Sequence, residues 1–226
     1  MNFLGIQYFE PTSTNQNSYR QFLNLSLSGG TSISGGAAVH SDPRTPIWYA
    51  AEEGRAGDRR RIDTIGGGGG DSDTAFTDLH FAAALGNSEK VLKLIRSGAN
   101  INERGDRGYT PLHLAAYGGH IDIVDILITN GANVDLLNDA ENTAVILATR
   151  GGHTNVVETL IQARADVNIQ DKDGMTALHW AAYGGHIDIV NTLIRNGANV
   201  NIQNDAENTA VYIATKKGYK NIANTL

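Results

Sequence analysis

The stretch that decides the fold is Thr110-Pro-Leu-His-Leu-Ala-Ala-Tyr-Gly-Gly-His120. Thr110 suits the residue that caps a helix N-terminus, and Pro111 suits the first helical position, where its missing N–H loses no hydrogen bond. The glycines at 118 and 119 are expected to end the helix, because glycine adopts the left-handed conformation without steric cost. The apolar residues lie on one helical face, at i, i+3 and i+4: Leu112, Ala115 and Ala116.

A second helix is predicted directly downstream. Its apolar positions follow helical spacing and favour an amphipathic helix that ends near Gly131: Ile121, Val124, Leu127 and Ile128. The segment from Asn133 onward then connects to the next unit in an extended conformation. One unit therefore consists of a helix, a turn, a second helix and an extended loop.

The unit recurs along the chain at intervals of 33 residues. Threonine, alanine, glycine and leucine each keep one register over five units, which chance does not explain. The threonines are Thr77, Thr110, Thr143, Thr176 and Thr209, and the leucines are Leu94, Leu127, Leu160, Leu193 and Leu226. A single unit buries too little apolar surface to be stable, so neighbouring units are expected to stack around a shared core.

These motifs resemble the ankyrin repeat, over about residues 73–226. The resemblance rests on Thr-Pro-Leu-His-Leu-Ala-Ala, Gly-Gly-His-Ile-Asp-Ile-Val and Asn-Gly-Ala-Asn-Val. It implies an all-α repeat fold, an ankyrin-type solenoid of helix-turn-helix units with extended hairpin loops. It also implies a protein–protein interaction module or scaffold that binds a partner protein through the concave groove of the array.

The sequence divides into three regions. Residues 73–226 form the predicted array, with four full units and a truncated fifth that stops inside its second helix. Residues 41–72 are interpreted as a degenerate first repeat that ends in the glycine-rich linker Gly66–Gly70, because residues 45–54 resemble residues 110–119. Residues 1–40 are interpreted as a flexible, non-repeat leader, with a short strand near Leu23–Leu27 as the alternative.

Composition narrows the function classes. The chain has 226 residues, with 24 acidic against 18 basic side chains and a net charge of −6, which disfavours nucleic acid as a partner. It contains no cysteine. The first residues do not read as a secretory signal, and no apolar run is long enough for a membrane span. The compartment stays unknown, with the cytoplasm favoured, and we expect a monomeric array.

No motif indicates catalysis, so we predict that the chain is not an enzyme and holds no cofactor or metal. The Gly66–Gly70 run is followed by Asp71 instead of the lysine of a phosphate loop. The basic run Arg59–Arg61 has acidic neighbours, which favours a solvated helix face. The resemblance implies structural roles for the repeated histidines, either in Thr-x-Leu-His or after the turn glycine: His80, His113, His179, His120, His153 and His186.

The resemblance also implies which residues contact a partner. These are the hairpin tips and the ends of the first helices, which differ between units while the core positions keep their type. Because of these positions, four large side chains are expected on an exposed strip: Tyr109, Tyr117, Tyr183 and Met175. Tyrosine and arginine are also common at the centres of interfaces. The full predicted set is Asp106, Arg107, Tyr109, Tyr117, Asp139, Asn142, Arg150, Lys172, Asp173, Met175, Tyr183, Asp205, Asn208, Lys216 and Lys217.

Several residues depart from the repeat pattern. Arg164 stands where other units have Gly98, Gly131 and Gly197, which predicts a strained left-handed residue. Glu141 and Glu207 replace hairpin glycines, so the tips of those units are expected to differ from the others. Trp180 is expected to pack in the core instead of anchoring a partner. Because the fifth unit is incomplete, the alternative function is the repeat arm of a larger effector, toxin, channel or enzyme.

Overall fold

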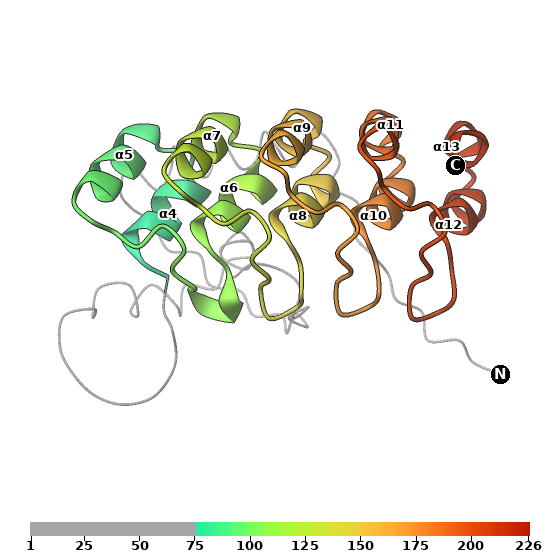
Figure 1. The fold of residues 1–226 in the computed structure, drawn as a ribbon, viewed down its shortest axis with the longest axis horizontal. Helices are drawn as coiled ribbons and strands as arrows, with labels where there is room; N and C mark the ends of the chain where they lie inside the picture. Colours follow the sequence, from blue (N-terminus) through green and yellow to red (C-terminus); the bar gives the residue numbers. More distant parts are fainter. Residues whose placement is uncertain (1–75) are drawn as a thin grey trace, which may run out of the picture. The chain divides into compact units, whose positions relative to one another are not determined.

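A computed structural model describes residues 76–226 (Figure 1), which lie within a compact unit that extends from Asp71 to Leu226. This part of the chain contains ten α-helices and one short 3-10 helix, η1 (Asp106–Gly108), and no strand. The predicted all-α repeat fold is therefore confirmed. The predicted leader 1–40, the degenerate repeat 41–72, the Gly66–Gly70 run and Arg59–Arg61 lie outside the described residues.

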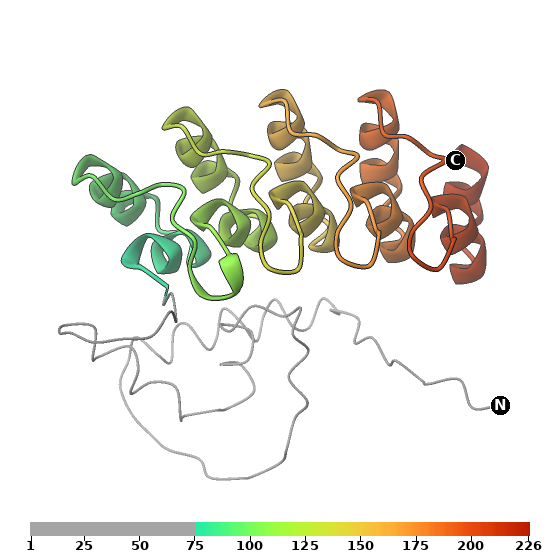
Figure 2. The ribbon, with the colours of Figure 1, turned by 60° about the horizontal axis from the view of Figure 1, so that its bottom comes forward.

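The helices form two rows with the hairpin loops beside them (Figures 1 and 2). The first helix of each unit packs against the first helix of the next, and the second helices do the same. The first helices are α4 (Asp78–Ala84), α6 (Pro111–Gly118), α8 (Ala144–Arg150), α10 (Ala177–Gly184) and α12 (Ala210–Lys217). The second helices are α5 (Ser88–Arg96), α7 (Ile121–Thr129), α9 (Thr154–Gln162), α11 (Ile187–Arg195) and α13 (Lys220–Thr225).

The first helices begin and end as the sequence predicts. The Thr110 hydroxyl accepts a hydrogen bond from the His113 backbone N–H, Pro111 occupies the first helical turn, and Gly119 ends α6 at φ 70°. Thr176 and Gly185 repeat this arrangement around α10. The capping hydroxyl satisfies one of the N–H groups that a helix N-terminus leaves without an intrahelical partner.

The core consists of columns of equivalent residues from successive units. Ala115, Ala148 and Ala181 are fully buried and small, which suits close packing of the first helices. The second helices contribute a leucine column that is also fully buried: Leu127, Leu160 and Leu193. Burying one leucine side chain stabilises a fold by about 1.5–3 kcal/mol. Truncating a central one to alanine costs about 2–5 kcal/mol.

The four hairpins within residues 76–226 close in the same way. In each, the backbone N–H of the first residue donates to the carbonyl oxygen of the fifth: Gly105 to Tyr109 at 2.8 Å, Asn138 to Asn142 at 3.1 Å, Asp171 to Met175 at 2.9 Å and Asn204 to Asn208 at 3.0 Å. Adjacent tips are joined as well, since a backbone N–H of each tip donates to a carbonyl of the tip before it: Asp139 to Arg107, Lys172 to Ala140 and Asp205 to Asp173. The hairpins therefore form one connected layer.

The expectation that Glu141 and Glu207 produce different tips is wrong. Both adopt the left-handed conformation, at φ 58° and 59°, beside 70° and 72° for Gly108 and Gly174. Such a conformation costs a residue with a Cβ about 1–2 kcal/mol. In these units an asparagine holds the turn, because Asn138 Oδ1 accepts from the backbone N–H groups of residues 140 and 142.

A side-chain ladder joins the extended segments of successive units. The Oδ1 atoms of Asn102, Asp135 and Asn168 each accept a hydrogen bond from a backbone N–H 31 residues downstream, at 2.7–3.0 Å. Asn102 and Asn168 also donate through Nδ2 to the carbonyls of Gly131 and Gly197. Asp135 has no N–H to donate to the equivalent carbonyl, that of Arg164. Arg164 has φ 67°, so the predicted left-handed residue is confirmed.

Candidate protein-binding surface

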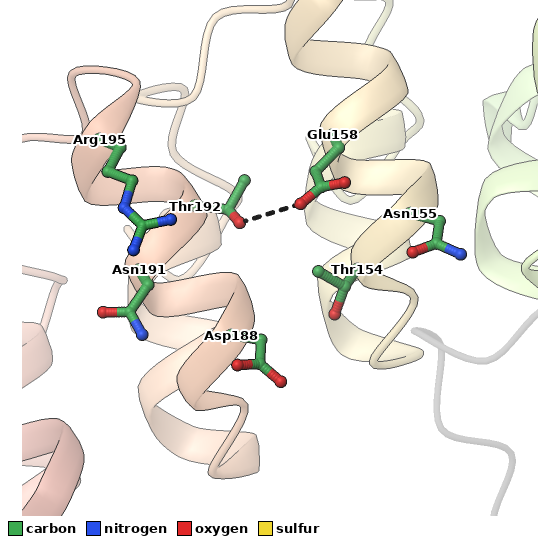
Figure 3. Close-up of a pocket in the computed structure, with 7 residues that line it drawn as sticks. All are labelled: Thr154, Asn155, Glu158, Asp188, Asn191, Thr192 and Arg195. Atoms are coloured by element: carbon green, nitrogen blue, oxygen red, sulfur yellow. Dashed lines mark hydrogen bonds between the residues drawn. The ribbon is translucent and has the colours of Figure 1, made fainter.

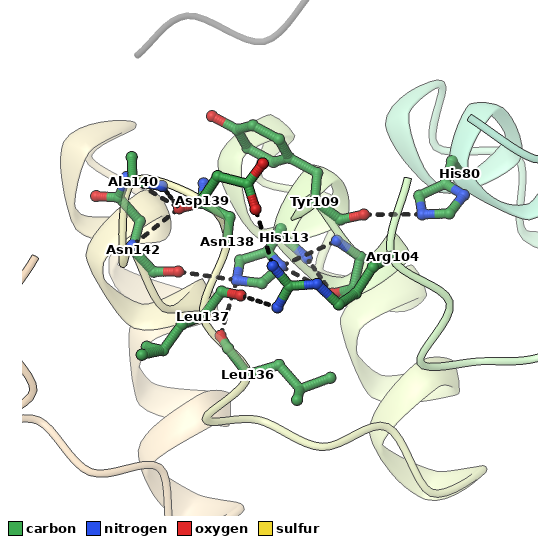
Figure 4. A network of polar contacts seen from close by, with 11 residues as sticks. His80, Arg104, Tyr109, His113, Leu136, Leu137, Asn138, Asp139, Ala140 and Asn142 are labelled. Atoms are coloured by element: carbon green, nitrogen blue, oxygen red, sulfur yellow. Dashed lines mark hydrogen bonds and ion pairs between the residues drawn. The ribbon is translucent and has the colours of Figure 1, made fainter. Parts of the chain in front are cut away.

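The histidines of the Thr-x-Leu-His motif hold the hairpins on the helices (Figure 4). His113 Nδ1 accepts from the Thr110 backbone N–H at 3.0 Å, and Nε2 lies 3.0 Å from the carbonyl oxygens of both Leu136 and Asn142. In the tautomer that this network requires, Nε2–H is the donor to both carbonyls. Burial lowers the pKa of His113 to about 4, so the ring is neutral at pH 7. His80 and His179 occupy equivalent positions.

The histidines that follow the turn glycines bridge neighbouring units. His120 Nε2 lies 2.9 Å from the Ala84 carbonyl, and His153 Nε2 lies 2.9 Å from the Tyr117 carbonyl. Burial lowers the pKa of both rings. A Cβ at Gly86 would lie 2.8 Å from the His120 ring, so that glycine is required by close packing as well as by its positive φ. Within residues 76–226, no group of three or more His, Cys, Asp or Glu side chains is arranged to hold a metal ion.

The hairpin tips and the first-helix ends share one surface, here called the hairpin–helix face. It comprises residues 104–109, 137–142, 170–175 and 203–208 together with the C-terminal turns of α6, α8, α10 and α12. Burial raises the pKa of the Tyr109 phenol to about 12, and charges on Arg150 and Arg107 act on it as well.

Three residues predicted on this surface are buried, which corrects their assignment as exposed contacts. Tyr109, Asn142 and Met175 have exposed fractions of 2%, 1% and 7%. Each directly precedes the capping threonine of a first helix, a position whose side chain often packs back against the first turns. Tyr109, for example, lies edge-on to His113 with 6.0 Å between ring centroids. Its place before the capping threonine was the sequence signal that we missed.

The other predicted contact residues are at least partly exposed. Asn208 occupies the same register as the three buried residues but is half-buried, in the last unit of the array. Whether these residues contact a partner stays a prediction. They are Asp106, Arg107, Tyr117, Asp139, Arg150, Lys172, Asp173, Tyr183, Asp205, Asn208, Lys216 and Lys217.

Comparison with known proteins agrees with this architecture. A family model described as ankyrin repeats, in three copies, matches residues 79–171 and 163–226. The chain belongs to the ankyrin repeat family. A search of curated proteins finds no match. Ankyrin repeats are generally protein–protein interaction modules and are typically non-catalytic. Among the helices of residues 76–226, none is both long and apolar enough to cross a membrane.

An aromatic and cationic cluster lies on the ankyrin array where α8, α10 and α12 adjoin. Trp180 is 8% exposed, which confirms that it packs in the core, and its Nε1–H donates to Asp171 Oδ2 at 2.8 Å. The Arg150 guanidinium lies 4.5 Å from the centre of the Trp180 ring. The Lys217 ammonium lies 3.7 Å from the centre of the Tyr183 ring. The sequence register placed these cations at helix ends, but it did not reveal which rings they cover.

Asp171 links this cluster to the hairpin layer. Its Oδ1 accepts from the backbone N–H groups of Asp173 and Met175, and its Oδ2 accepts from Trp180. Burial nevertheless raises the pKa of the carboxyl group, while the hydrogen bonds act in the opposite direction. Asp171 therefore fixes the hairpin and the tryptophan relative to each other.

A hollow of about 460 Å³ lies between two second helices, α9 and α11 (Figure 3). The hydroxyl of Thr192 on α11 lies 3.5 Å from Glu158 Oε1 on α9. The lining is polar and includes none of the predicted contact residues: Thr154, Asn155, Glu158, Asp188, Asn191, Thr192 and Arg195.

Proposed function

We propose that this ankyrin array binds a partner protein through its hairpin–helix face. The observation that carries the proposal is that the hairpin backbones are alike in every unit while the exposed side chains at their tips differ. Four hairpins have the same closing bond and the same left-handed fourth residue, and neighbouring tips are bonded to each other. The exposed residue at the second tip position of the last three units nevertheless changes from Asp139 to Lys172 to Asp205.

A connected backbone layer suits recognition because little conformational freedom remains to be lost on binding. His80, His113 and His179 fix three of the four hairpins on the helix of the unit before them, and the unit that lacks the histidine has Ile146 in its place. The face also contains side chains common at interface centres, including Tyr117, Arg150 and Tyr183. The second helices, here called the outer helices, contain no aromatic residue from α5 to α13.

Site-specific photo-crosslinking tests this proposal in the cell that makes the protein. A photoreactive amino acid replaces Asp173 or Lys216 on the hairpin–helix face, and in control variants it replaces Asp125 or Asp188 on the outer helices. All four side chains are exposed, so none of these changes removes core packing. We expect a common cross-linked protein from the first two positions only. Equal cross-linking from the outer positions, or none from the hairpin–helix face, would show that the proposal is wrong.

A further inference from the structure

We propose that the C-terminal half of the hairpin–helix face recognises an acidic, extended segment of the partner protein, one that presents carboxylate side chains to Arg150, Lys216 and Lys217. This inference rests on the proposed function and adds the chemistry of the partner. It starts from an uneven distribution of charge over the first helices.

The first helices of the last four units carry cations and no carboxylates. Helices α6, α8, α10 and α12 contain no Asp or Glu, and their charged residues are Arg150, Lys216 and Lys217. The second helices of the same four units contain four carboxylates and two cations, Arg195 and Lys220, so they have a net charge of −2. The chain as a whole has a net charge of −6, so this patch opposes the overall charge.

These three cations contact aromatic rings instead of carboxylates. Arg150 covers Trp180, Lys217 covers Tyr183, and Lys216 lies 5.4 Å from the centre of the Tyr212 ring. None of them has a carboxylate within ion-pair distance among residues 76–226, whereas Lys90 pairs with Asp78 and Arg104 pairs with Asp139. The negative end of a helix dipole favours cations at these helix ends. It does not account for the rings beneath them, which hold the cations in place for a ligand.

The spacing of the cations defines the length of the segment. Arg150 is on α8 and Lys217 is on α12, with α10 between them. Adjacent packed helices are about 8–10 Å apart, so the two cations are about 16–20 Å apart along the array. An extended chain advances about 3.3 Å per residue and places alternate side chains on one face. Two carboxylates about six residues apart on the same face therefore meet Arg150 and the lysine pair.

The hairpin tips favour a peptide over a nucleic acid. In the last three units the tips expose five carboxylates and a single cation, Lys172: Asp139, Glu141, Asp173, Asp205 and Glu207. A nucleic acid carries a phosphate at every nucleotide and would place phosphates beside these carboxylates. A peptide can direct its acidic side chains to the helix ends and its neutral or basic ones to the tips.

The test is an NMR titration of the full ¹⁵N-labelled chain with a synthetic peptide that has two glutamates about six positions apart. The Trp180 indole N–H is the reporter, because Arg150 lies over that ring. We expect saturable shifts of this resonance that weaken as salt is added. A peptide with lysine in place of glutamate should not bind, and one with the glutamates about three positions apart should bind more weakly.

Two triple variants with the same change in net charge complete the test. In the first, Arg150→Gln, Lys216→Gln and Lys217→Gln remove the cations of the proposed site. We expect the affinity for the acidic peptide to fall about tenfold, since each exposed ion pair contributes a factor of about two to five. In the second, Lys93→Gln, Arg195→Gln and Lys220→Gln remove exposed cations of the second helices, and affinity should stay within about twofold. The double variant Lys216→Gln/Lys217→Gln changes only exposed residues and so guards against misfolding of the first triple variant.

Three outcomes would overturn the acidic-segment inference. They are equal losses in the two triple variants, equal binding of the lysine peptide, and tighter binding of a single-stranded oligothymidylate than of the acidic peptide. Cross-linking at Asp173 separates this inference from the proposed function. If the partner still cross-links there in the first triple variant, the partner uses the face but not these cations. If the probe at Asp173 gives no cross-linked partner even in the chain that keeps all three cations, the proposed function itself fails.

Discussion

Replacing Arg164 by glycine is expected to stabilise the array. Arg164 has φ 67° at the position where Gly98, Gly131 and Gly197 have φ between 87° and 92°. At those three glycines an added Cβ would meet no atom within 4 Å. The strain at Arg164 therefore comes from its backbone conformation and not from crowding by neighbouring groups.

The magnitude follows from two opposing effects. The left-handed conformation costs a residue with a Cβ about 1–2 kcal/mol. Glycine loses about 0.5–1 kcal/mol more conformational entropy on folding than alanine does. The difference leaves a gain of about 0.5–1 kcal/mol for Arg164→Gly. For a cooperative array of this size, that gain raises the melting temperature by about 1–4 °C.

Urea and thermal unfolding followed by circular dichroism measure the effect. Arg164→Ala is the matched control, because it removes the same charge but keeps a Cβ and so should leave stability near that of the original chain. The reciprocal change Gly131→Ala should destabilise the array by about 1 kcal/mol. A melting temperature for Arg164→Gly at or below that of Arg164→Ala would refute the reasoning.

Three further predictions concern polar groups between or within units. Asp135→Asn should stabilise the array by about 0.5–1.5 kcal/mol in urea unfolding, because it supplies the missing N–H donor to the Arg164 carbonyl; a loss of stability would contradict this. Acidification from pH 7.5 to pH 5 should lower the free energy of unfolding by about 2 kcal/mol through His113 alone, because its folded pKa of about 4 lies below its unfolded value of 6.5 and the unfolded chain therefore binds more protons. The raised pKa of Asp171 acts in the opposite direction. Urea unfolding at both pH values measures the change, and a rise in stability on acidification would reject the prediction. Trp180→Leu should lower the free energy of unfolding by about 1–3 kcal/mol, because it leaves Asp171 Oδ2 without its donor. The double variant with Asp171→Asn should lose less stability than the sum of the two single variants. Additive losses would show that the hydrogen bond contributes nothing to stability.

The repeat pattern made the fold predictable from sequence. A threonine before the helix, alanines along one face and a glycine after it are local requirements, and each recurs every 33 residues. The strain at Arg164 was predictable for the same reason, because its register matched three glycines. Local backbone preference and side-chain size do not depend on which unit lies next to which.

Contacts between units decided what the sequence register left open. Tyr109, Asn142 and Met175 lie at the end of a hairpin, directly before a capping threonine, and the packing of each hairpin against its helix buries them. Glu141 and Glu207 adopt the same left-handed conformation as Gly174, in hairpins whose first side chain makes the same two hydrogen bonds to the backbone.

The sequence by itself therefore determined the helices, their order and their stacking, since these follow from periodic local preferences. Only the tertiary structure decided which of the predicted contact residues are exposed and which cation covers which ring. Arg150 and Trp180 are 30 positions apart in the chain and meet because α8 packs against α10. That contact depends on the geometry between two units, which a pattern read within one unit does not contain.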